Sequence, residues 1–192
     1  MSDKKPLDSL LCNADHCCLL IIDIQSKLTA AMPGKVLERL KRNSSMLLQA
    51  AGKLSMPVMV TRQYPQGLGP LIPEVTDMLP DDHKLFDKTC FSCTDADGFM
   101  ENLGSTGRRQ IVIAGIEAHI CVLQTAIALR SAGFDVFVVS DAVSSRQREN
   151  YENAIQRMHA SDIIICNTES MLFEWLRDAS HPHFKALSAL IK

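Results

Sequence analysis

Short apolar runs recur along this 192-residue chain, and longer stretches with helical periodicity separate them. The runs are rich in Ile and Val and mostly lack polar alternation, which is typical of strands buried on both faces of a parallel sheet. They cover residues 17–22, 58–60, 85–86, 111–114, 136–139 and 163–166. Alternation of such strands with helices predicts right-handed crossovers and a doubly wound α/β fold.

Five stretches between or after these runs have helical patterns. In the first, apolar side chains recur at spacings of three, four or seven residues, namely Leu37, Leu40, Leu47, Ala51 and Leu54. The others cover residues 121–132, 147–158, 169–179 and 184–191. Residues 63–84 hold four of the eight prolines and two glycines. We expect a long loop with little regular structure there, and loops of that length are often functional.

Length and composition limit the classes of protein that fit. A chain of this length with 46% hydrophobic and 22% charged residues suits one globular domain, covering residues 1–192. The net charge of −2 lacks the basic excess that nucleic acid or a membrane surface would attract, so we expect neither partner. The N-terminal stretch lacks the apolar core of a signal peptide. The seven cysteines, several within apolar runs, favour reduced thiols in the cytoplasm.

Three polar side chains stand where strands of the predicted sheet end. Ligands bind beyond the carboxyl ends of strands in an open parallel sheet. Asp23 follows the first run, Lys88 follows the third, and Cys121 comes shortly after the fourth, at a predicted helix start that favours a thiolate. Together they could supply a base, a cation and a nucleophile. Taken singly, each also has a structural interpretation, as a strand-end cap, a surface lysine or a core thiol.

Three segments have the order and spacing of a known family: LLIIDIQ at 19–25, KTCFS at 88–92 and GIEAHICV at 115–122. On these the chain resembles the isochorismatase-like cysteine hydrolases over nearly its whole length. Two further segments, QYPQGLGP at 63–70 and HPHFK at 181–185, resemble the subgroup of isochorismatase domain-containing proteins. The resemblance implies a Rossmann-like, three-layer α/β/α fold with six parallel strands.

The resemblance also implies a catalytic arrangement. Asp23 would be the general base, Lys88 the charge stabiliser and Cys121 the nucleophile. A cis peptide bond would join Ile116 to Glu117. The backbone N–H groups of Glu117 and Cys121 would then form an oxyanion hole for the tetrahedral intermediate.

Five further residues are candidates for the substrate pocket. They are Gln25, Gln63, Tyr64, Phe91 and His119. For Tyr64 and Phe91 ordinary packing is an equal alternative, and for His119 so is a plain polar position at a helix start. The likeness further implies a homo-oligomer, a dimer or larger.

We expect no metal and no other cofactor. Nicotinamidases of this fold bind a metal through an aspartate and histidines in the loop after the second strand. Here that loop reads TRQYP at 61–65, with no histidine before His83. Cys90 and Cys93 have the spacing of a redox or zinc pair, but a structural zinc site needs a second pair, which the sequence lacks. A redox role for this pair stays open.

The resulting hypothesis is a metal-independent hydrolase that acts on a small molecule. It would cleave a C–N bond, amide or carbamoyl, through an acyl-enzyme on Cys121. Such bonds suit this chemistry better than the vinyl ether of isochorismate. The alternative is a binding or interaction protein on the same fold with little or no catalysis.

Overall fold

Six strands form a single parallel sheet in the order β3-β2-β1-β4-β5-β6. The structure is a computed structural model that describes residues 10–191. The strands are β1 (Cys17–Ile22), β2 (Val58–Gln63), β3 (Lys84–Lys88), β4 (Gln110–Ile116), β5 (Asp135–Ser144) and β6 (Ile164–Cys166). The strand order reverses between β1 and β4, where ligands bind in doubly wound sheets. The predicted fold class is confirmed.

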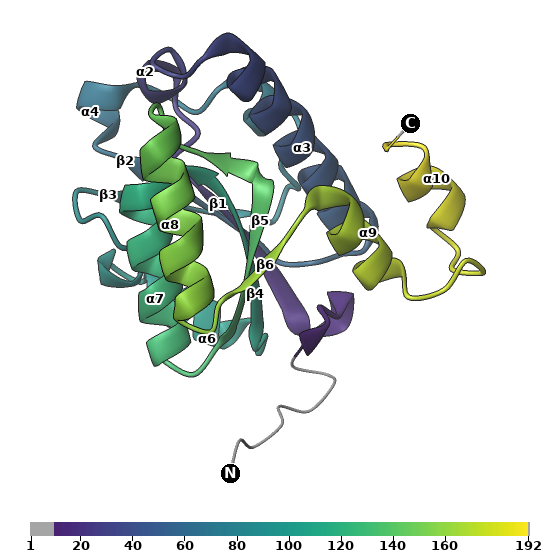
Figure 1. The fold of residues 1–192 in the computed structure, drawn as a ribbon. Coiled ribbons are helices and arrows are strands. Elements are labelled where there is room, and N and C mark those ends of the chain that lie inside the picture. Colours follow the sequence, from purple (N-terminus) through teal and green to yellow (C-terminus); the bar gives the residue numbers. More distant parts are fainter. Residues whose placement is uncertain (1–9, 192) are drawn as a thin grey trace.

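Helices cover both faces of the sheet (Figure 1). On one face lie α3 (Gly34–Lys53) and α9 (Thr168–Leu176), and beyond α9 lies α10 (Phe184–Ser188). On the other lie α6 (Phe99–Ser105), α7 (Leu123–Ser131) and α8 (Arg148–Ala160). Between residues 10 and 191 we find no helix with both the length and the apolar character to cross a bilayer.

Strand β1 shows why its sequence lacks polar alternation. All six of its residues are buried. Leu19 and Ile21 belong to the core beneath α3 and α9, whereas Leu20 and Ile22 belong to the core beneath α7 and α8. Because both faces of the strand pack against helices, every position favours an apolar side chain.

The proline-rich stretch contains more structure than we predicted. Two single-turn helices, α4 (Pro65–Leu68) and α5 (Pro73–Thr76), interrupt it. Each begins with a proline, whose fixed φ suits the first helical position and whose missing N–H would have no partner there. The other short elements are η1 (Ala14–His16), α2 (Ser26–Thr29), η2 (Cys93–Asp95) and the π-helical turn η3 (Ala118–Val122).

The carboxyl ends of β4 and β5 reach further than their apolar runs. β5 continues to Ser144, and the register of the pair shifts between Ile113 and Gly115. Gly115 has a φ of +135°, and a Cβ there would stand 2.1 Å from the backbone oxygen of Ile22. A glycine is therefore needed at this position, where β4 packs closely against β1 just ahead of the turn η3.

Candidate active site

The three predicted catalytic residues lie at the carboxyl edge of four neighbouring strands. Asp23 follows β1, Lys88 is the last residue of β3, and Cys121 lies in η3 after β4. Strand β2 runs between β1 and β3 and ends at Gln63. The side chain of Gln63 contacts both Lys88 and Cys121.

Asp23 and Lys88 form a fully buried ion pair. The Lys88 Nζ lies 2.7 Å from Asp23 Oδ2, and neither side chain is exposed to solvent. The other carboxylate oxygen, Oδ1, accepts a hydrogen bond of 2.7 Å from the Thr61 hydroxyl. Asp23 has a φ of +53°, a left-handed conformation that aspartate tolerates better than most residues. The carboxylate is therefore held by β2 and β3 together.

Four oxygens surround the Lys88 ammonium. Besides Asp23 it donates to Gln63 Oε1 at 2.6 Å and lies 3.3 Å and 3.2 Å from the carbonyls of Cys90 and Phe91. Burial lowers the pKa of Lys88, but the Asp23 carboxylate raises it by more, so the net shift is upward. The side chain is thus a fixed cation at neutral pH.

The Cys121 thiol is buried, and only 5% of the residue is exposed. Its Sγ lies 3.9 Å from Gln63 Oε1. Burial and then the Asp23 carboxylate raise the pKa of Cys121 well above its usual value, while Lys88 acts in the opposite direction. This direction is opposite to the shift expected from a helix start alone, because burial and the Asp23 charge outweigh Lys88.

Gln63 and Gln25 bind each other reciprocally. The backbone N–H of Gln63 donates to Gln25 Oε1 at 2.7 Å, and Gln25 Nε2 donates to the Gln63 carbonyl at 3.0 Å. Gln25 Nε2 also donates to Gly69 O at 2.7 Å, and Gln63 Nε2 donates to Thr89 O at 2.7 Å. Gln25 is fully buried and binds the loop at Gly69. Gln63 Oε1, in contrast, faces the Cys121 thiol and the Lys88 ammonium.

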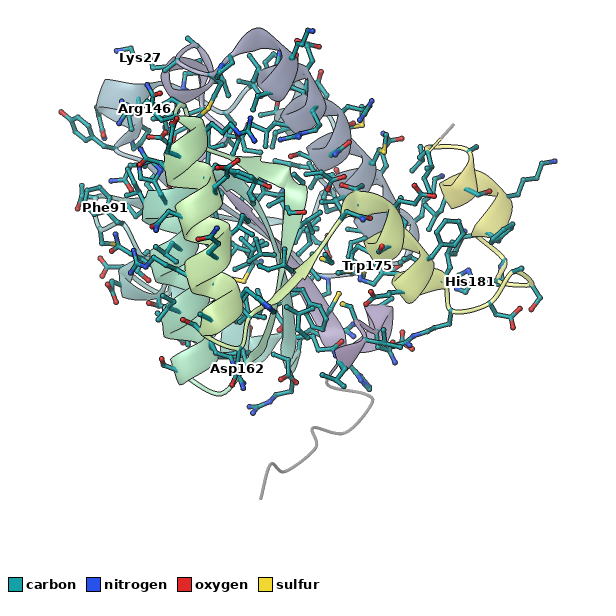
Figure 2. The ribbon with its side chains drawn as sticks, viewed as in Figure 1. Lys27, Phe91, Arg146, Asp162, Trp175 and His181 are labelled. Carbon is teal, nitrogen blue, oxygen red and sulfur yellow. The ribbon has the colours of Figure 1, made fainter. Side chains whose placement is uncertain are left out.

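The two aromatic candidates are exposed. Tyr64 and Phe91 are 53% and 52% exposed, and Figure 2 shows Phe91 at the margin of the molecule. Tyr64 lines a cavity of about 320 Å³ together with Lys88, Thr89 and Cys90. Phe91 is not among the residues that line it. Of the two, only Tyr64 borders the cavity that Lys88 also lines.

His119 contacts both the connection between β5 and α8 and the first turn of α8. Its Nδ1 lies 2.9 Å from Ser145 Oγ and its Nε2 lies 3.4 Å from Asn150 Nδ2. It lines a separate cavity of about 470 Å³ along α7, shared with Ser92 and Leu123.

Glu117 follows a cis peptide bond from Ile116. Its side chain is buried and binds Arg146: Oε2 accepts the Arg146 backbone N–H at 3.0 Å, and Oε1 lies 3.4 Å from Arg146 Nε. Sequence reasoning missed Arg146, because no local signal joins residues so far apart in the chain.

Cys93, the second residue of the cysteine pair, lies beside the ion pair. It is fully buried, and its Sγ lies 3.7 Å from Thr61 Oγ1, the hydroxyl that binds Asp23. Burial raises the pKa of Cys93 to about 11. Cys90 is partly exposed, and all seven cysteines are free.

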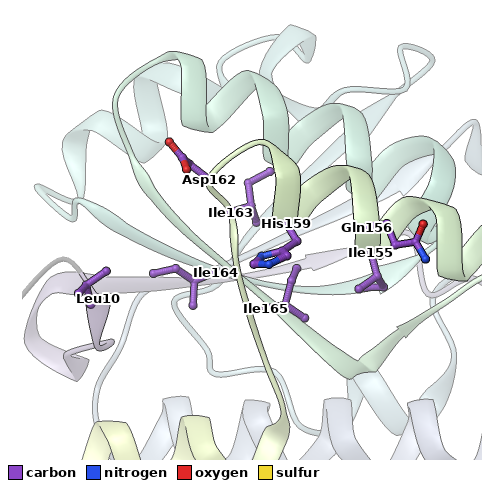
Figure 3. A pocket seen from close by; sticks show the side chains of 8 residues that line it. All are labelled: Leu10, Ile155, Gln156, His159, Asp162, Ile163, Ile164 and Ile165. Atoms are coloured by element: carbon purple, nitrogen blue, oxygen red, sulfur yellow. The ribbon is translucent and has the colours of Figure 1, made fainter. Parts of the chain in front are cut away.

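A further cavity lies apart from the candidate catalytic residues. A cavity of about 570 Å³ lies between β6 and α8, and its lining is mainly apolar, including Ile155, Ile163 and Ile165 (Figure 3). None of the three candidate catalytic residues borders it. Over residues 10–191, no group of three or more His, Cys, Asp or Glu side chains is arranged to hold a metal ion.

Known proteins match both the sequence and the structure. The isochorismatase domain model matches residues 17–170. Isochorismatase domain-containing protein 2 of Xenopus laevis is 41% identical over 145 residues, which are 76% of this chain and 69% of the relative. A Caenorhabditis elegans structure described as MAR1 ribonuclease is 33% identical with a TM-score of 0.88, covering 94% of this chain and 92% of that one. The Escherichia coli YcaC product, described as an octameric hydrolase of unknown specificity, is 25% identical with a TM-score of 0.88, covering 98% and 91%.

Proposed function

The chain belongs to the isochorismatase family, and on that premise we propose that it is a metal-independent cysteine hydrolase. The proposed reaction cleaves a C–N bond, amide or carbamoyl, of a small molecule. One observation carries the proposal: a fully buried Asp23–Lys88 pair is linked to the Cys121 thiol through Gln63 Oε1. Family membership supports a hydrolase.

The proposed first step forms a bond between sulfur and carbon. Cys121 Sγ attacks the substrate carbonyl carbon while its proton passes to the Asp23 carboxylate. The raised pKa of the thiol fits a transfer that accompanies attack rather than precedes it. The carbonyl oxygen gains the negative charge, and the backbone N–H groups of Glu117 and Cys121 are the proposed donors to it.

The proposed second half releases the products. Asp23 returns its proton to the leaving nitrogen, the C–N bond breaks, and an acyl-thioester remains on Cys121. Water then attacks the thioester, Asp23 again takes a proton, and the acid leaves as the thiol is restored. Throughout, Lys88 keeps its charge, because its pKa is raised and four oxygens hold it.

The test is a panel of small amides, carbamoyl compounds and ureides, with ammonia as the readout. Replacing Cys121 with Ala should lower kcat/KM by about 10⁴-fold or more on any true substrate, as loss of a nucleophile does elsewhere. Cys166→Ala is the matched control, because Cys166 is also a free cysteine but lies in β6, at the edge of the sheet opposite β3. Unchanged turnover in Cys121→Ala would refute the mechanism.

The alternative is a protein that binds partners on this fold without turnover. A blank panel, together with a Cys121 that resists alkylation even at alkaline pH, would favour it. RNA belongs in the panel because of the ribonuclease description of the Caenorhabditis elegans structure. RNA cleavage that survives Cys121→Ala would point to a different site.

Three further features belong to the proposal. The chain acts as one domain, which the single sheet formed by all six described strands supports. It forms a homo-oligomer, supported by the octameric description of the Escherichia coli structure and testable by light scattering. It works in the cytoplasm, where seven free thiols would stay reduced, and cell fractionation tests this.

A further inference from the structure

Three arginines surround a cavity of about 320 Å³ that lies outside the catalytic centre. Arg39 comes from α3, Arg148 is the first residue of α8, and Arg146 lies in the short connection between β5 and α8. Figure 2 shows Arg146 near the first turn of α8. The cavity therefore lies between α3 and α8, which pack on opposite faces of the sheet, at the carboxyl end of β5.

The lining of this cavity holds three arginines and one acidic residue. That residue, Glu152, binds Arg148 at 2.6 Å. Outside the lining, Glu117 lies 3.4 Å from Arg146 Nε, and Glu149 in the first turn of α8 acts on Arg148. Within residues 10–191, Arg39 takes part in no ion pair. Like charges that share a small cavity repel one another, and an anion between them removes that repulsion.

The lining favours one class of anion. Guanidinium groups bind phosphate oxygens with paired hydrogen bonds, and a phosphate monoester has three acceptor oxygens, so one phosphate can accept from all three arginines. The N-terminus of α8, a helix of 13 residues, adds partial positive charge on the same side. Pro33 and Val36 give the cavity an apolar wall that an organic group can contact.

We propose that this cavity binds a small organic phosphate monoester, with its phosphate held by Arg39, Arg146 and Arg148. Neither Asp23, Lys88 nor Cys121 lines the cavity, so the site is separate from the catalytic centre and does not rest on the hydrolase reaction. The two are neighbours nonetheless, because Arg146 binds the Glu117 side chain, and Glu117 begins the turn that carries Cys121.

The test is isothermal titration calorimetry of the full chain with glycerol 3-phosphate, and with glycerol as the uncharged control. The double variant Arg39→Ala/Arg148→Ala removes two of the three cations. Arg42→Ala/Arg157→Ala is the matched control, because it changes the same two helices and the same net charge at exposed positions outside the cavity.

Saturable binding by the wild-type chain is expected, with the affinity reduced at least tenfold in the first variant and within about twofold of wild type in the control. The single variant Arg39→Gln should weaken binding in the same direction, and since Arg39 is exposed and unpaired it should leave the melting temperature unchanged. Equal loss in both double variants would mean general charge attraction and would overturn the proposal. So would the absence of saturation up to about 10 mM ligand.

Discussion

The Lys88 ammonium crosses the end of β2 to reach Asp23, with 2.7 Å between Nζ and Oδ2 and no solvent exposure of either side chain. A buried ion pair stabilises little by itself, but removing one partner leaves an uncompensated charge. We therefore expect Lys88→Met to lower the free energy of unfolding by about 3–5 kcal/mol. Urea denaturation measures this.

The double variant Asp23→Asn/Lys88→Met is the control for that prediction. It removes both charges, so part of the stability lost in Lys88→Met should return, and under the proposed mechanism neither variant should hydrolyse substrate. If the double variant is as unstable as Lys88→Met, the loss comes from packing and not from the unpaired carboxylate.

Gln63 should affect the rate more than substrate binding. Its Oε1 accepts from Lys88 at 2.6 Å and lies 3.9 Å from Cys121 Sγ, so it helps to fix both groups. A hydrogen bond to a charged group is worth about 1.5–3 kcal/mol. Gln63→Leu should therefore lower kcat by about 10–100-fold. Steady-state kinetics on a substrate from the panel separates kcat from KM.

Gln49→Leu is a suitable comparison for Gln63→Leu, because Gln49 lies on α3 and its side chain binds only Ser45. Its kinetics should match wild type. A Gln63→Leu variant with normal kcat and a raised KM would show that Gln63 binds substrate and does not position Lys88 and Cys121.

Alkylation of Cys121 should depend steeply on pH. Because the pKa of the thiol is raised, little thiolate exists near neutral pH, and the rate with iodoacetamide should rise about tenfold per pH unit over the neutral and mildly alkaline range. Asp23→Asn removes a carboxylate that raises this pKa, so alkylation at a given pH should become faster. Lys88→Met removes a charge that lowers it, and alkylation should become slower. Mass spectrometry of the labelled peptide follows each rate.

Cys18 is the internal standard for this experiment. It is fully buried in β1, and burial raises the pKa of its thiol to about 12. It should resist labelling wherever the fold is intact. Slower alkylation of Cys121 in Asp23→Asn than in wild type would contradict the electrostatic account of the site.

The sequence predicted secondary structure best where buried apolar residues recur in runs along the chain. The apolar runs of β1 and β4 became strands because both faces of the sheet are covered there, whereas β3 is an edge strand whose Leu85 is exposed. Asp23, Lys88 and Cys121 could be placed because parallel strands end at one edge. α6 was missed: it has only seven residues, and its two buried side chains, Phe99 and Leu103, make too short a pattern.

The pKa values and hydrogen bonds of the site depend on contacts between residues far apart in the sequence, which a short stretch of sequence cannot predict. The raised pKa of Cys121 follows from burial and from Asp23, nearly a hundred residues earlier in the chain. The contact between Glu117 and Arg146, and the position of Gln63 Oε1 between Lys88 and Cys121, likewise follow from tertiary packing.

Gly115 should be intolerant of any side chain. Its φ is +135°, and an added Cβ would stand 2.1 Å from the carbonyl oxygen of Ile22, a contact that only movement of β4 away from β1 could relieve. We expect Gly115→Ala to lower the free energy of unfolding by about 1–3 kcal/mol. It should also lower the proposed hydrolase activity, because Asp23 follows β1 and the turn η3 with Cys121 follows β4. Gly104→Ala is the matched control: Gly104 lies in α6 with open space around its Cβ position, and alanine should stabilise it by about 0.5–1 kcal/mol. Urea denaturation of both variants decides the matter, and a Gly115→Ala protein as stable as Gly104→Ala would show that the two strands can separate freely at this point.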